Sequence, residues 1–105
     1  MADNNAVYEV LWPRGRRTAK KIPLAKRLDT LEGKTIGELS DRMFRADETF
    51  PVIEKALENR YPGVRFVNFE VFGNIHGSKE TEAIAALAEN LRNNNCDAVI
   101  TGNGC

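Results

Sequence analysis

The residues best suited to chemistry stand at the end of the chain, where Cys105 follows the short turn formed by Gly102, Asn103 and Gly104. A thiolate is a nucleophile and a redox group, and its reactivity depends on a lowered pKa. Two glycines allow a tight turn with an exposed backbone, so a thiol at its tip would meet a ligand bound there. The same turn is also typical of a plain loop, and a terminal cysteine can be a merely exposed thiol.

A second candidate is the loop of residues 73–77, which contains Asn74 and the only histidine, His76. Histidine changes its charge near neutral pH, so it is a natural acid or base beside a thiol. A loop histidine can equally be structural or solvent-exposed. Asp41, Asp47 and Glu48 are expected to be turn and helix caps rather than acids or bases.

Cys96 opens an apolar segment and is expected to be an inert packing residue. Two thiols nine residues apart match no zinc spacing, so no metal site is predicted. No cofactor is indicated by the sequence.

The elements that must position these groups alternate along the chain. We expect strands over residues 34–39, 64–72 and 96–100, although Gly37 and Glu38 weaken the first. Between them we expect a helix that ends at Pro62 and Gly63, and a second helix capped by Ser78. Pro51 is expected in the first turn of the first helix.

This order of elements indicates an α/β fold, specifically a flavodoxin-like or Rossmann-like three-layer β-α-β-α-β arrangement with a short parallel sheet. Ligands of such sheets bind beyond the carboxyl ends of the strands. Three segments should therefore converge there: Asp41 and Arg42 with their loop, residues 73–77, and residues 102–105.

Residues 1–33 are expected to form an extended basic arm, and residues 34–105 a β-α-β-α-β half-domain that is incomplete at its C-terminus. Residues 1–35 hold eight basic and four acidic residues, against seven and eleven in the remainder. Ile22, Leu24, Leu28 and Leu31 are spaced to lie on a hydrophobic surface, which favours a clamped arm over a free tail. A sheet with so little cover predicts a homo-oligomer or a larger partner chain.

The whole chain, with 42% hydrophobic and 29% charged residues and no net charge, is typical of a globular domain. No apolar run reaches the roughly 18–20 residues of a membrane span, so no membrane interaction is expected. The polar N-terminus favours a cytoplasmic location. The basic arm lacks the interleaved aromatic residues of a stacking surface, so nucleic-acid binding is not expected.

Three segments together resemble one family. They are PLAKRLDTLEGKTIG (residues 23–37), FRADE with the following Phe50 and Pro51, and DAVITGNGC (residues 97–105). The chain resembles the UGSC family of (seleno)proteins over nearly its whole length. The resemblance implies a doubly wound domain similar to those of the glycine-reductase group, with a cysteine or selenocysteine and then Gly-Ser-Cys just after the third strand. This chain ends where that motif would begin, so only Cys105 and its turn can be matched to the family's site.

The leading functional hypothesis is therefore a thiol- or selenol-dependent redox protein, or a subunit of one. Cys105 would be the reactive thiol, residues 102–104 the backbone cradle, and His76 an acid or base beside them. A reading frame cut at a selenocysteine codon is one expectation for the end of the chain. The alternatives are a non-catalytic partner subunit of a hetero-oligomeric enzyme, and a small-anion-binding module at the same turn.

Overall fold

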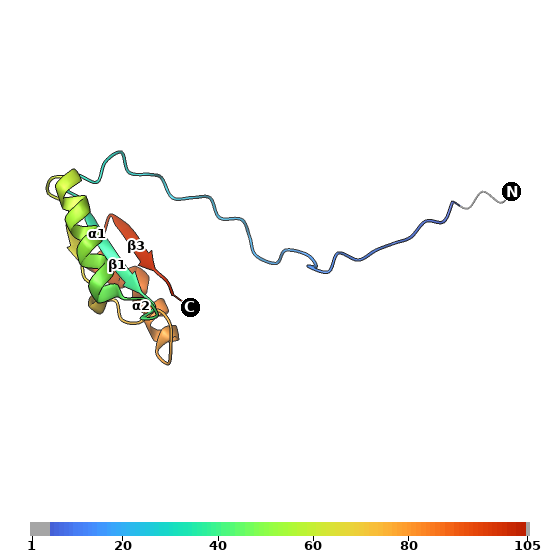
Figure 1. Cartoon of the computed structure of the whole chain (residues 1–105). Helices are drawn as coiled ribbons and strands as arrows, with labels where there is room; N and C mark the ends of the chain where they lie inside the picture. Colours follow the sequence, from blue (N-terminus) through green and yellow to red (C-terminus); the bar gives the residue numbers. More distant parts are fainter. Residues whose placement is uncertain (1–4, 105) are drawn as a thin grey trace.

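A computed structural model describes residues 5–104 of the chain. Its elements are β1 (Thr35–Ser40), α1 (Ala46–Arg60), β2 (Arg65–Val67), a 3-10 helix η1 (Phe69–Val71), α2 (Glu80–Asn93) and β3 (Ala98–Gly102). Within residues 5–104 the strands form one three-stranded sheet in the order β2-β1-β3, and both pairs are parallel (Figure 1). The expected α/β class with a small parallel sheet is confirmed.

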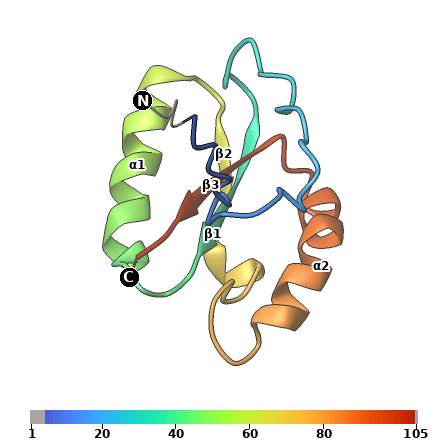
Figure 2. The same cartoon turned by 90° about the vertical axis from the view of Figure 1, so that its right-hand side faces the viewer.

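Strand β1 is the centre of the fold, because all six of its residues are buried. The helices α1 and α2 lie on opposite sides of the sheet (Figure 2). Gly37 explains how α2 comes so close, since a side chain at this position would stand only 3.0 Å from Leu91 of α2 and 3.1 Å from the sulfur of Cys96. The glycine that weakens the strand in sequence terms is therefore required by the packing.

Helix α1 begins earlier than the sequence indicates. Its first residue is Ala46, so Pro51 lies inside the helix and not in its first turn, where it was expected. Asp47 and Glu48 do occupy the first turn, where acidic side chains favour the positive end of the helix dipole. The core beneath the helix contains Phe50, 1% exposed, which packs against Ala46 and Phe69.

The expected strand over residues 64–72 is mostly wrong, because only Arg65–Val67 pair with β1. The side chain of Asn68 accepts a hydrogen bond of 2.9 Å from the backbone N–H of Glu70 and starts the 3-10 helix η1. This turn directs Phe69 into the core, where its ring centroid lies 5.7 Å from that of Phe50. Burial of an aromatic side chain thus outweighs the β propensity of the segment.

The remaining boundaries shift by a few residues. Lys79, not Ser78, is the N-cap of α2, and Glu80 and Glu82 lie in its first turn. Strand β3 starts at Ala98 and includes Gly102. Just before it, the side chain of Asp97 accepts a hydrogen bond of 2.9 Å from the N–H of Thr35, and its backbone N–H donates to the carbonyl of Thr35 at 2.8 Å. Among the described residues no helix is long and apolar enough to cross a bilayer.

The described part of the arm, residues 5–33, runs away from the folded part as an extended chain (Figure 1). Ile22 and Leu24 are 87% and 86% exposed, so the described chain does not cover them and the expected clamping of the arm stays a prediction. Leu31 alone of the four spaced apolar residues is half-buried, where the arm meets the domain beside Asp97 and Ala98. The arm therefore presents its apolar side chains to solvent.

Candidate functional site

The three segments expected to converge do meet at the carboxyl edge, which is the end of the sheet where β1 and β3 finish at Ser40 and Gly102. Ser40 forms a parallel bridge with Asn74, and its carbonyl accepts a hydrogen bond of 3.2 Å from the N–H of Ile75. The N–H of Asp41 donates to the carbonyl of Gly102 at 3.3 Å. Backbone hydrogen bonds thus extend the order of the sheet into the loops beyond it.

Asp41 connects two of these segments through its side chain. One carboxylate oxygen accepts the N–H of Met43 at 2.9 Å, and the other accepts the N–H of Gly104 at 2.8 Å. The N–H of Met43, then the N–H of Gly104 and the nearby ring of His76, lower the pKa of Asp41 against the opposing effect of burial. Asp41 is a cap, as expected, but its second partner stands 63 positions away in the sequence.

The two glycines of the terminal turn are explained by close packing. A side chain at Gly102 would collide with the ring of Phe44, and one at Gly104 would collide with the carbonyl of Met43. Asn103 between them is exposed. The loop after β1 therefore lies directly against residues 102–104, and only glycine permits this approach.

Asn74 and His76 lie in the neighbouring loop. The side chain of Asn74 accepts a hydrogen bond of 2.9 Å from the N–H of His76, which shapes the turn. The Nδ1 atom of His76 is 3.6 Å from a carboxylate oxygen of Glu80, and the imidazole is 64% exposed. Asn74 also lines an open depression of about 460 Å³ between this loop and the start of α2.

Cys105 itself lies outside the described residues, so the structure places the turn that leads to it and not the thiol. Cys96 is half-buried against β1, and burial, followed by the charge of Asp97, raises the pKa of its thiol. A raised pKa disfavours the reactive thiolate. This agrees with the expected packing role of Cys96.

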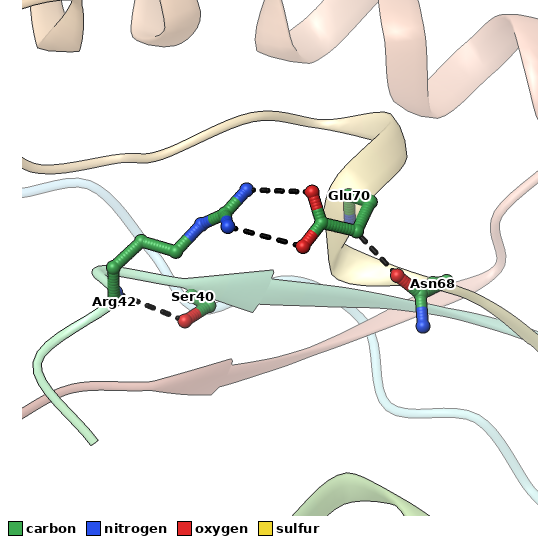
Figure 3. A network of polar contacts seen from close by, with 4 residues as sticks. All are labelled: Ser40, Arg42, Asn68 and Glu70. Atoms are coloured by element: carbon green, nitrogen blue, oxygen red, sulfur yellow. Dashed lines mark hydrogen bonds and ion pairs between the residues drawn. The ribbon is translucent and has the colours of Figure 1, made fainter. Parts of the chain in front are cut away.

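Arg42 connects the carboxyl edge to η1 (Figure 3). Its guanidinium makes two hydrogen bonds, of 3.0 and 2.8 Å, to the carboxylate of Glu70, and it lies 5.4 Å from the ring centroid of Phe69. Its backbone has a φ of 63°, a left-handed conformation, and its N–H donates to the hydroxyl of Ser40 at 3.0 Å. The loop after β1 is thus anchored to η1 as well as to the terminal turn.

Sequence reasoning missed the most unusual group in the fold, the carboxyl of Glu38 in the middle of β1. Glu38 is 1% exposed, and neither of its carboxylate oxygens has a hydrogen-bond partner of normal geometry among the described residues. Burial, and then the neighbouring carboxyl of Glu54 on α1, raise its pKa to about 8. The signal was present in the sequence as a charged residue directly followed by Leu39 and preceded by Ile36 and Gly37 in the expected strand.

The chemistry open to the carboxyl edge follows from these contacts. Within residues 5–104 there is no group of three or more histidine, cysteine or acidic residues that could hold a metal ion. The N–H of Gly104 already donates to the carboxylate of Asp41, whose lowered pKa keeps it negative near neutral pH. A small anion at this turn would therefore meet an occupied donor and a like charge, which disfavours the anion-binding alternative.

The fold and this edge define a small parallel α/β protein whose candidate site lies where the loops after β1 and β3 meet. The model of the UGSC family matches residues 9–105, and the chain belongs to this family. Searches among curated proteins and among solved structures gave no match.

Proposed function

We propose that the chain forms the carboxyl-edge site of a thiol- or selenol-dependent redox protein. The observation that carries the proposal is the hydrogen bond of 2.8 Å between Asp41 and the N–H of Gly104, the residue directly before Cys105. It holds the last part of the chain at the end of the sheet where such folds bind ligands. Membership of the UGSC family supports the proposal, because the resemblance noted above implies a thiol or selenol just after the third strand.

The reaction we propose is thiol–disulfide exchange. The thiolate of Cys105 attacks one sulfur of a disulfide substrate, a new S–S bond forms, and the other sulfur leaves as a thiolate. The proton released by Cys105 passes to His76, which later returns it to the departing sulfur. A second thiol or selenol would then displace the bound half of the substrate as a thiol, so that the pair of electrons moves from the protein to the substrate.

We also propose that the sheet is the first half of a flavodoxin-like three-layer domain. The parallel order β2-β1-β3 and the position of the helices on opposite sides support it (Figure 2). In that arrangement β2 and β3, which follow one another in the sequence, lie on opposite sides of β1, and the site would lie at this point.

The test is the rate at which Cys105 reacts with iodoacetamide and with glutathione disulfide near pH 7. Cys96 serves as an internal reference, since its raised pKa predicts a slow reaction. We expect Cys105 to react faster than a free cysteine, Cys105→Ser to abolish the reduction of glutathione disulfide, and Cys96→Ser to leave it unchanged. His76→Ala should slow the exchange near pH 7, because the proposed step uses this imidazole to take the proton of Cys105.

A Cys105 that is no more reactive than free cysteine would contradict the proposal, as would unchanged disulfide reduction in Cys105→Ser. The second candidate function, a non-catalytic subunit of a larger enzyme, predicts that inert thiol together with a stable hetero-oligomer. The observation that favours it is the incompletely covered edge strand β3, whose Val99 is 41% exposed.

A further inference from the structure

The arm carries a set of large apolar side chains that are mostly exposed to solvent. Their exposed fractions lie between 63% for Trp12 and 96% for Leu11, and the set comprises Val7, Tyr8, Val10, Leu11, Trp12, Ile22 and Leu24. Single exposed apolar residues are ordinary, but seven within eighteen positions of one segment are typical of an interaction surface.

The dimensions of the chain show how much surface is left uncovered. A compact protein of 11.7 kDa exposes about 5,900 Å², whereas this chain exposes 9143 Å². Its radius of gyration is 21.8 Å, against about 13 Å for a compact domain of this length. The excess surface is larger than the roughly 1,200–2,000 Å² that a stable interface buries in total. A docked arm therefore has enough area to hold two molecules together.

Charge indicates what the arm would bind. Residues 14–27 contain seven basic residues and no acidic one, whereas residues 36–105 contain eleven acidic and seven basic residues. The folded part of the same chain is thus the electrostatic complement of the arm. A second copy of the chain can therefore serve as the acidic partner of the arm.

The surface that would receive the arm lies beside α2 and β3. Val99 pairs with Gly37 in the sheet, and Gly37 faces α2, so Val99 points to the α2 side of the sheet. There it is 41% exposed, and Ile84 of α2 is 52% exposed. Asp97 is exposed beside Val99, and Glu80, whose side chain is 45% exposed, lies one helical turn before Ile84. This surface, with apolar centres and acidic neighbours, matches the composition of the arm.

The direction of the arm favours another molecule over its own domain. Residues 25–28 and Leu31 line a groove with Asp97, Ala98 and Val99, and from there the chain leads away from the sheet (Figure 1). We propose that two copies of the chain exchange arms, each arm lying on the acidic α2 and β3 side of the other copy. The two contacts are then identical and close the assembly as a two-fold dimer. This proposal is independent of the thiol chemistry proposed above.

The experiment is sedimentation equilibrium of the full chain, with the emission of Trp12, the only tryptophan, recorded over the same concentrations. We expect a dimer, a blue shift of the emission as it forms, and dissociation as salt is raised. Lys20→Glu with Lys21→Glu should weaken the dimer at least about tenfold. Leu11→Ser with Leu24→Ser should weaken the dimer by the same factor at low and at high salt. The matched controls are Lys55→Glu and Val52→Ser, exposed charged and apolar positions on α1.

Carbodiimide cross-linking of mixed unlabelled and ¹⁵N-labelled copies then identifies the contact. We expect isotopically mixed cross-links that join Lys20 or Lys21 to Glu80 or Asp97. A monomer at all concentrations, a dimer unaffected by the arm variants, or cross-links confined to single copies would each overturn the proposal. The arm side chains are exposed, so loss of folding does not confuse the result, and circular dichroism checks this directly.

Discussion

Replacement of Glu38 by Gln should remove a strong pH dependence of the stability of this fold. Glu38 lies in the central strand with 1% of its surface exposed, and its carboxylate oxygens have no hydrogen-bond partner among the described residues. The folded protein therefore keeps the proton of Glu38 up to pH values near 8, whereas the unfolded chain releases it near 4.5. Stability of the wild type must fall as the pH rises between these two values and level off above them.

The size of the effect follows from the two pKa values. The difference between 4.5 and about 8 corresponds to about 5 kcal/mol at 1.36 kcal/mol for each pH unit. Most of this is lost between pH 5 and pH 8. Small domains have total stabilities of about 5–15 kcal/mol, so the wild type would lose a large share of its stability over that range.

The assay is urea unfolding followed by far-UV circular dichroism at pH 5, 6, 7 and 8. For a slope of about 1.5 kcal/mol per molar urea, the midpoint of the wild type should fall by about 2 M relative to that of Glu38→Gln. Glu54→Gln should reduce the fall only in part, because burial is the largest cause of the shift and Glu54 the lesser one. Glu58→Gln, at an exposed position on the same helix, is the control.

Parallel pH profiles for the wild type and Glu38→Gln would refute the reasoning, since they would mean that Glu38 is hydrated or paired in solution. A profile that rises with pH in the wild type alone would refute it as well. Changes in stability that the wild type shares with Glu38→Gln, Glu54→Gln and Glu58→Gln come from other groups. The difference between the wild type and Glu38→Gln therefore isolates one carboxyl.

Two further predictions concern the carboxyl edge. Gly102→Ala should lower the free energy of unfolding by about 1–3 kcal/mol, because the new methyl group collides with Phe44. Thermal unfolding measures this change, and Asn103→Ala is the control at an exposed position. Equal stability of the two variants would show that the loop after β1 does not pack as described. Asp41→Asn should speed amide hydrogen exchange at Gly104 by about tenfold or more, because the side-chain amide of Asn offers one acceptor oxygen where the carboxylate offers two. Since the pKa of Asp41 is lowered, its contribution to stability is present above its ordinary pKa of 3.8 and is lost as the pH falls through the folded value. The stability of Asp41→Asn should therefore fall less in acid than that of the wild type. Asp47→Asn is the exposed control, and an exchange rate at Gly104 that is the same in Asp41→Asn as in the wild type would contradict the role of Asp41.

Much of the architecture follows from local signals that the sequence carries. The stop signals at Pro62 and Gly63, the acidic residues at both helix starts and the apolar stripes predict two helices, and the short apolar runs between them predict a parallel sheet. The convergence of three loops at the carboxyl edge also follows, because parallel strands joined by helices all end on the same side. These features depend on neighbours only a few positions apart.

Tertiary contacts decided the rest, because the groups involved are far apart in the sequence. The segment after Val67 has strand-like composition, but the core attracts Phe69 and turns it into a 3-10 helix. Gly37 and Gly102 are explained only by α2 and Phe44, which reach them from other elements. Asp41 finds Gly104 across 63 positions, and Glu38 acquires its raised pKa only when α1 covers it. A sequence therefore states which side chains are present, whereas burial and long-range approach decide what those side chains can do.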